Sequence, residues 1–164
     1  MAKKAIYPGS FDPPTLGHLS VVRRAAGVMD ELEIVVVHNP NKNAMFSGAD
    51  RVKLWQESLA EAGLSKVRVS LLEGGLIAEH AVSLGANAII KGLRTAEDLD
   101  YELQFANMNR DLSGIETFFF ATEPAYSHIS SSLVREVAAL GGDVSAHVPG
   151  AVAMALSDRL GKCP

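Results

Sequence analysis

The sequence predicts an α/β fold, because short runs of β-branched and aromatic residues alternate along it with segments of helical periodicity. Alternation of this kind produces a mainly parallel sheet with right-handed crossovers. We therefore expect a Rossmann-like, doubly wound five-stranded parallel sheet with helices on both faces. A chain of 164 residues fits one domain, here residues 1–164, that buries roughly two-thirds of its unfolded surface.

Five segments have the composition of strands, and we place them at residues 5–7, 33–38, 66–71, 88–91 and 116–121. Helical stripes lie between and after them. Their apolar residues are Val21, Val22, Ala25, Ala26 and Met29; Val52, Trp55 and Leu59; Ile77, Ala81 and Leu84; Leu99, Leu103 and Ala106; and Leu133, Val134, Val137 and Ala138. A last helix is expected to begin at Pro149, a residue tolerated in a first turn, and to bury Val152, Leu156 and Leu160.

The composition argues against several classes of protein. A net charge of −4 is unusual for a general nucleic-acid binder, although a few Lys and Arg suffice for a pocket that binds a small anion. No apolar run reaches transmembrane length, and the first residues do not resemble a signal peptide. The single cysteine, Cys163, cannot form an internal disulfide. We expect a cytoplasmic protein without nucleic-acid or membrane partners.

The first chemical motif is Thr-Leu-Gly-His at residues 15–18, which follows a predicted strand and a proline-containing turn. Gly9 and Gly17 allow the backbone to approach a ligand, and Thr15 can cap the following helix. His18 then falls in the first turn, where its imidazole can donate a hydrogen bond to a phosphate oxygen whose charge grows in a transition state. The alternative is an ordinary polar first-turn residue, but the strand–turn–helix context favours function.

The second motif is the run Ser130, Ser131 and Ser132, which precedes an apolar helix. One serine is enough to cap a helix. Three in a row, with Arg135 nearby, indicate hydroxyls and amides that surround an anion. Helix N-termini that follow strands are favoured phosphate sites, so this motif strengthens the first.

The third motif is Lys-Gly-Leu-Arg at residues 91–94, at the carboxyl end of a predicted strand. Lysine offers phosphate a point charge and arginine a two-pronged donor. The alternative is a solvated basic turn paired with Glu97 or Asp98, but ligands of parallel sheets bind at strand carboxyl ends. Lys42, in a polar loop, could reach over the same site, and Glu102 could accept from a ribose or adenine.

Other chemistries find little support. The remaining histidines have no metal-ligand spacing, and neither a Ser-His-Asp nor a Cys-His pattern is present. The absence of a Walker sequence argues against a P-loop kinase. Direct in-line attack on phosphorus, without a covalent enzyme intermediate, is therefore the expected mechanism.

These motifs resemble bacterial phosphopantetheine adenylyltransferases. The matching elements are Tyr-Pro-Gly-Ser-Phe-Asp-Pro at 7–13, the motifs at 15–18 and 91–94, Tyr-Glu at 101–102, Asn-Met-Asn-Arg at 107–110 and Ile-Ser-Ser-Ser at 129–132. They occur in family order and spacing from Ile6 to about Pro149. The T-x-G-H element alone marks the wider nucleotidyltransferase superfamily, whereas residues 91–94 with 107–110 narrow the resemblance to this family.

The resemblance implies transfer of AMP from ATP to 4′-phosphopantetheine, which gives dephospho-coenzyme A and pyrophosphate in coenzyme A biosynthesis. It also implies Mg²⁺ held mainly by the ATP phosphates, a homohexamer, and coenzyme A as a feedback inhibitor. The rival interpretations are a related adenylyl- or cytidylyltransferase acting on nicotinate mononucleotide or glycerol phosphate, and a nucleotide-binding regulatory module without catalysis. The motifs at 91–94 and 107–110 argue against the first, and His18 and Lys42 against the second.

The same resemblance assigns roles to individual residues. The implied catalytic residues are His18, Lys42 and Arg94, and no protein ligand to a metal is implied. The implied ATP-binding residues are Ser10, Phe11, His18, Gly92, Leu93, Arg94, Glu102, Tyr126, Ser127, His128, Ile129, Ser130, Ser131 and Ser132. The implied 4′-phosphopantetheine-binding residues are Ser10, Lys42, Ile77 and Lys91. Ser10 stands where the family often has Thr, and Lys91 where Arg also occurs.

Overall fold

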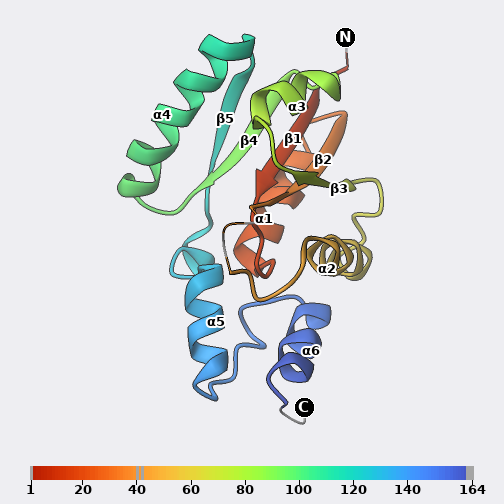
Figure 1. The fold of residues 1–164 in the computed structure, drawn as a ribbon, viewed down its shortest axis with the longest axis vertical. Coiled ribbons are helices and arrows are strands. Elements are labelled where there is room, and N and C mark those ends of the chain that lie inside the picture. The colour runs from red at the N-terminus through yellow and green to blue at the C-terminus, as the bar shows by residue number, and fades with distance from the viewer. Residues whose placement is uncertain (1, 40, 42, 162–164) are drawn as a thin grey trace.

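A computed structural model of the chain describes residues 2–39, 41 and 43–161, and it confirms the predicted fold class (Figure 1). The fifth predicted strand has the predicted bounds, whereas the third begins and ends two residues later than predicted. The elements in chain order are β1 Lys4–Gly9, α1 Leu16–Ala26, β2 Glu31–His38, α2 Gly48–Glu61, β3 Arg68–Glu73, α3 Ile77–Ser83, β4 Ala88–Leu93, α4 Ala96–Ser113, β5 Glu116–Ala121, the 3₁₀ turn η1 Pro124–Tyr126, α5 Ser131–Ala139 and α6 Gly150–Arg159.

The sheet is parallel throughout, with the strand order β3-β2-β1-β4-β5. From β1 the chain adds β2 and β3 on one side of the sheet and then β4 and β5 on the other, so the topological switch point lies between β1 and β4. β1 pairs with β2 along its whole length, but its register with β4 consists of Ala5 with Ala88 and Ile6 with Ile89. Beyond Ile6 the two central strands separate toward their carboxyl ends. A crevice at this switch point is where doubly wound sheets bind ligands.

Helices cover both faces of the sheet, as predicted. Successive strand residues point to opposite faces, so Tyr7 and Ile34 pack in one cluster with α1 and α2, while Ile6 and Val35 pack in another with α3. Each of these four side chains is at most 4% exposed. Burial on both sides explains why the strands are nearly continuous apolar runs.

A third apolar cluster lies beyond the carboxyl ends of the strands, where α5 and α6 pack with Phe46 and with Leu54 of α2. Figure 1 shows α5 and α6, in blue, at this end of the molecule. Both oxygens of Glu61, the last residue of α2, accept backbone N–H groups at the start of α6, from Gly150 at 3.1 Å and Ala151 at 2.9 Å. Pro149 precedes α6 as its cap rather than opening it.

The predicted helical stripes are buried with some exceptions. Met29 follows the end of α1, Leu133 of α5 is 43% exposed, and Leu160 is half-buried past the end of α6. The longer helix predicted around Leu99, Leu103 and Ala106 is confirmed as α4, but none of its residues is buried and Leu103 is 41% exposed. No helix within the described ranges has the length and apolar character needed to cross a membrane.

Candidate active site

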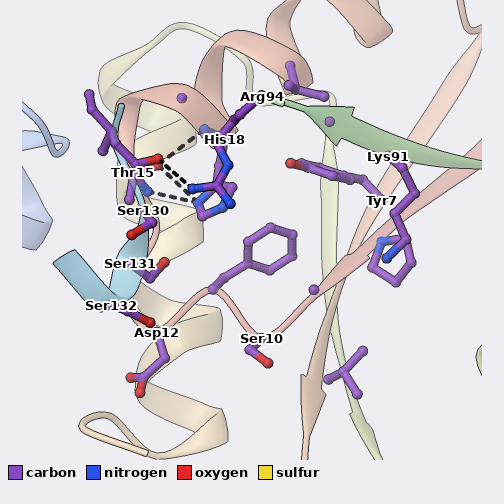
Figure 2. A pocket seen from close by; sticks show the side chains of 18 of the residues that line it. Tyr7, Ser10, Asp12, Thr15, His18, Lys91, Arg94, Ser130, Ser131 and Ser132 are labelled. Atoms are coloured by element: carbon purple, nitrogen blue, oxygen red, sulfur yellow. Dashed lines mark hydrogen bonds between the residues drawn. The ribbon is translucent and has the colours of Figure 1, made fainter. Parts of the chain in front are cut away.

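A pocket of about 430 Å³ opens at the carboxyl ends of β1, β2 and β4 and reaches the first turns of α1 and α5. Segments more than a hundred residues apart in sequence therefore share one cavity (Figure 2). The predicted site residues that line it are Ser10, Phe11, His18, Lys91, Gly92, Arg94, Glu102, Ile129, Ser130, Ser131 and Ser132. The three motifs recognised in the sequence thus meet in space.

Some predicted residues lie elsewhere. Ile77, at the start of α3, packs against the cluster that contains Ile6 and Val35 and is absent from the pocket lining. Leu93 contributes its backbone carbonyl, which accepts the Thr122 N–H at 2.7 Å. Tyr126, Ser127 and His128 form the turn that leads into α5 and are absent from the pocket lining. Lys42 lies outside the described residues.

Thr15 and His18 form a reciprocal cap at the start of α1, as the sequence predicted for Thr15. The Thr15 hydroxyl accepts the His18 backbone N–H at 3.3 Å, and the imidazole Nδ1 of His18 accepts the Thr15 backbone N–H at 3.1 Å. Figure 2 shows these bonds. Because Nδ1 is an acceptor here, the proton of the neutral ring belongs on Nε2.

The surroundings of His18 favour its neutral form. Burial and, to a smaller extent, the positive charge of Arg94 together lower the pKa of His18 from 6.5 to about 4. The ring also meets Phe11 edge to face, with the ring centroids 5.0 Å apart. A donor that stays uncharged and fixed in orientation can offer a hydrogen bond to an anion throughout the neutral pH range.

Phe11 organises the turn before α1. Its ring also meets Tyr7 and Trp55 edge to face at 5.1 Å, and its backbone has a φ of 48°. A Cβ on Gly9 would lie 2.7 Å from the Phe11 ring, so a larger residue at Gly9 would displace that ring. The close approach that explains Gly9 is therefore to Phe11, whereas the sequence suggested a ligand.

The two cations of the third motif are already paired with acids of α4. Lys91 Nζ lies 3.2 Å from a carboxylate oxygen of Glu102. Arg94 donates from Nε and Nη2 to Asp98, at 3.0 and 3.2 Å, and its Nη1 donates to the Ile129 carbonyl at 3.4 Å. The sequence offers this pairing with Asp98 as an alternative to a place in the binding site. In the structure both hold, because Arg94 and Asp98 are paired and both line the pocket.

Ser130, Ser131 and Ser132 line the pocket, and the first two also form hydrogen bonds within the protein. Ser130 caps α5 by accepting the Leu133 N–H at 3.1 Å, and the Ser131 hydroxyl donates to the Pro13 carbonyl at 2.8 Å. Arg135 donates to the Asp12 carbonyl, and its Nη1 lies 3.7 Å from the Asp12 carboxylate. α5 is thereby attached to the turn before α1, and its N-terminus lies at the pocket.

Sequence reasoning missed three buried polar residues of the pocket lining: Tyr7, Asp12 and Arg51. Burial raises the pKa of the Tyr7 phenol, and the charge of Glu102 adds to the rise, so this hydroxyl stays protonated. Arg51 is 2% exposed and Asp12 6%. The sequence contained a signal that could have identified Arg51. It stands four positions before Trp55, so it lies on the apolar stripe of its helix, where a charged residue is unexpected.

Comparison with known proteins shows the family of this chain. Residues 6–137 match the cytidylyltransferase-like family. The phosphopantetheine adenylyltransferase of Clavibacter michiganensis subsp. michiganensis is 49% identical over 160 residues, which cover 97% of this chain and 98% of that protein. The phosphopantetheine adenylyltransferase of Kocuria rhizophila is 53% identical over 157 residues, which cover 96% and 99%.

Solved structures share the fold at low sequence identity. A putative nicotinate-nucleotide adenylyltransferase from Vibrio parahaemolyticus has a TM-score of 0.67 at 22% identity, covering 96% of this chain and 92% of that one. A bifunctional NMN adenylyltransferase/ADP ribose pyrophosphatase from Francisella tularensis has a TM-score of 0.72 at 15% identity, covering 99% and 51%. By its motifs, its fold and its relatives, the chain belongs to the phosphopantetheine adenylyltransferases, a family of nucleotidyltransferase enzymes.

Proposed function

We propose that this protein transfers AMP from ATP to 4′-phosphopantetheine, forming dephospho-coenzyme A and pyrophosphate by direct in-line attack. The supporting observation is the meeting, in one crevice between β1 and β4, of two helix N-termini with His18, Lys91 and Arg94. The names of the full-length relatives support the choice of substrates. No covalent enzyme intermediate is needed, because catalysis consists of orientation and stabilisation of negative charge.

In this proposal ATP occupies the side of the pocket formed by α5 and Arg94. The start of α5 offers backbone N–H groups and the positive end of a helix dipole to the triphosphate. Arg94, already oriented by Asp98, adds a guanidinium close to the same segment. The more distant Tyr126, Ser127 and His128 remain predicted nucleotide contacts of the turn before α5.

The acceptor phosphate occupies the opposite side, near Ser10, Lys91 and the loop that contains Lys42. Its oxygen attacks the α-phosphorus of ATP, a new P–O bond forms, and the bond from the α-phosphorus to the β-phosphate bridging oxygen breaks. Pyrophosphate leaves with that electron pair. In this proposal His18, whose Nδ1 accepts from Thr15, donates from Nε2 to a non-bridging oxygen of the α-phosphate as its charge grows.

Mg²⁺ is proposed to enter with the polyphosphate. Within the described ranges no group of three or more His, Cys, Asp or Glu side chains could hold a metal ion. The pocket's acids have other partners: Asp12 accepts two backbone N–H groups, Asp98 binds Arg94 and Glu102 binds Lys91. Phosphate oxygens and water would supply the ligands, as Mg²⁺ commonly accepts, and the ion would neutralise phosphate charge when bound.

The family resemblance also implies a homohexamer, and we propose α4 as part of its contact surface. Tyr101, Phe105, Met108 and Leu112 are between 48% and 61% exposed, and the rings of Tyr101 and Phe105 lie 5.0 Å apart. An exposed group of this size is typical of a protein–protein contact. Regulation by coenzyme A and a cytoplasmic location complete the proposal by resemblance.

The direct test of the function is an ATP-dependent assay. We expect purified protein with ATP, Mg²⁺ and 4′-phosphopantetheine to release pyrophosphate and form dephospho-coenzyme A, identified by mass. Nicotinate mononucleotide and glycerol phosphate serve as matched acceptors and should give no product above background. Turnover on either of these, or tight ATP binding without turnover on any acceptor, contradicts the proposal.

Replacement of His18 by Ala tests the proposed transition-state donor. We expect His18→Ala to fold and bind ATP with near-normal affinity but to lose about a hundredfold or more in kcat, as observed when one such donor is removed. His80→Ala, in α3 on the other face of the sheet, is the control and should keep its turnover. Near-normal kcat in His18→Ala would remove this residue from the mechanism.

The pKa of His18 can be read by NMR titration of its ring protons. We expect a midpoint at about 4. Since an unfolded histidine takes up its proton near 6.5, the unfolded chain binds more protons between these values. This site therefore lowers the free energy of unfolding as pH falls from 6.5 to 4.

Arg94→Gln should raise the His18 pKa but leave it below 6.5, because burial is the larger cause. Arg68→Gln, an exposed substitution on β3, is the matched control and should not move it. A wild-type midpoint near 6.5 would show that the ring is not held in its neutral form.

The α4 contact predicts an effect of charge on assembly. We expect Met108→Glu to shift the sedimentation coefficient from a hexamer toward smaller species, because a carboxylate cannot be buried in an apolar contact without a partner. Val28→Glu places the same charge on a residue 55% exposed beyond α1 and should leave assembly unchanged. A monomeric wild-type protein, or an unaltered Met108→Glu hexamer, would refute this surface.

A further inference from the structure

Arg51 is a buried cation that the proposed mechanism does not use. It lies in the first turns of α2, is 2% exposed and contributes to the pocket lining. Among the described residues its guanidinium forms no ion pair, since each of its observed contacts is a carbonyl or an imidazole. A buried charge is costly unless hydrogen bonds satisfy it, so this arrangement indicates a specific role.

The partners of Arg51 belong to both ends of the loop between β2 and α2. At the beginning of the loop, Nη1 donates to the Val37 carbonyl at 3.2 Å and Nη2 donates to His38 Nδ1 at 2.9 Å. At its end, Nε donates to the carbonyls of Phe46 at 3.1 Å and Ser47 at 3.3 Å. The Arg51 side chain therefore joins the residues before the loop to the residues at its end.

Arg51 also joins this loop to the turn before α1. Its Nη1 donates to the Ser10 carbonyl at 2.6 Å. From that same turn, the Asp12 carboxylate accepts the backbone N–H groups of Met45 at 2.8 Å and Phe46 at 2.9 Å. The end of the loop is thus held to the turn by two independent sets of bonds.

The loop so attached forms one wall of the pocket. Asn39, Asn43 and Ala44 line it. By sequence, Lys42 stands directly before Asn43. The bonds leave from three different nitrogens of the guanidinium, so a lysine at position 51, with its three donors on one nitrogen, could not replace them all.

We propose that Arg51 is a positioning residue for the second substrate: it holds residues 43–47, the end of the loop before α2, near the turn at Ser10, and so places the wall that binds the acceptor phosphate. The proposal rests on the proposed function, in which this wall faces the acceptor and α5 faces ATP. It follows that loss of Arg51 weakens acceptor binding selectively, because the α5 side is built from Arg94 and Arg135, to which Arg51 makes no hydrogen bond.

The test compares Arg51→Lys and Arg51→Gln with the wild type and with Lys53→Gln, an exposed control on the same helix. The Kd for ATP is measured by calorimetry, and KM for each substrate and kcat by pyrophosphate release. We expect both Arg51 variants to raise KM for 4′-phosphopantetheine about tenfold or more, while the Kd for ATP changes less than about threefold. Lys53→Gln should match the wild type.

A second variant keeps the test decisive if an Arg51 variant fails to fold. His38→Phe retains Arg51 and leaves the bonds of Asp12 intact but removes the ring nitrogen that accepts from Arg51 Nη2, so we expect an acceptor-selective rise in KM of the same kind. An unchanged acceptor KM in the folded variants, or an equal weakening of ATP and acceptor, overturns the positioning role. A wild-type protein that binds ATP but does not use 4′-phosphopantetheine instead overturns the proposed function.

Discussion

The separation of β1 from β4 is the constraint on which the rest of the site depends. The two strands pair at Ala5 and Ile6 and then part, while β1 continues to pair with β2. Pro8 brings no N–H to a ladder, so it suits a position where one side of the strand is open. Gly92 faces this gap from β4, where a Cβ would lie 3.0 Å from Val21 of α1. The crevice, the close approach of α1 and the pocket all follow from this divergence.

The polar groups around the crevice are held by partners within the chain. Glu102 and Asp98 orient Lys91 and Arg94, and the Thr15 N–H orients the imidazole of His18. Preorganised donors stabilise developing charge without reorganisation during the reaction, which is a large term in enzyme catalysis. The neutral state of His18 has the same origin, because burial and the neighbouring cation both disfavour its protonation.

A network of hydrogen bonds around the pocket joins segments that are far apart in the sequence. Asp12 connects the turn before α1 to Met45 and Phe46, at the end of the loop before α2, and through Arg135 to α5. Arg51 connects β2, the same turn and the end of the following loop. Both residues bond mainly to backbone groups, so they set the course of the chain more than they neutralise each other. Buried polar groups with satisfied bonds specify one arrangement of such loops.

The sequence alone determined the fold class, the order of strands and helices along the chain, the cap at Thr15 and the three motifs that meet at the pocket. These depend on local composition and on periodicities of 2 and 3.6 residues, which can be read directly along the chain. Only the tertiary structure decided that Gly9 accommodates Phe11, that Ile77 packs against the cluster of Ile6 and Val35 and not in the pocket lining, and that α4 is exposed. Likewise, the roles of Asp12 and Arg51 follow from backbone groups that distant segments bring to them. A pattern along one segment records its own conformation, whereas the partner of a buried polar or apolar side chain is chosen by how separate segments pack.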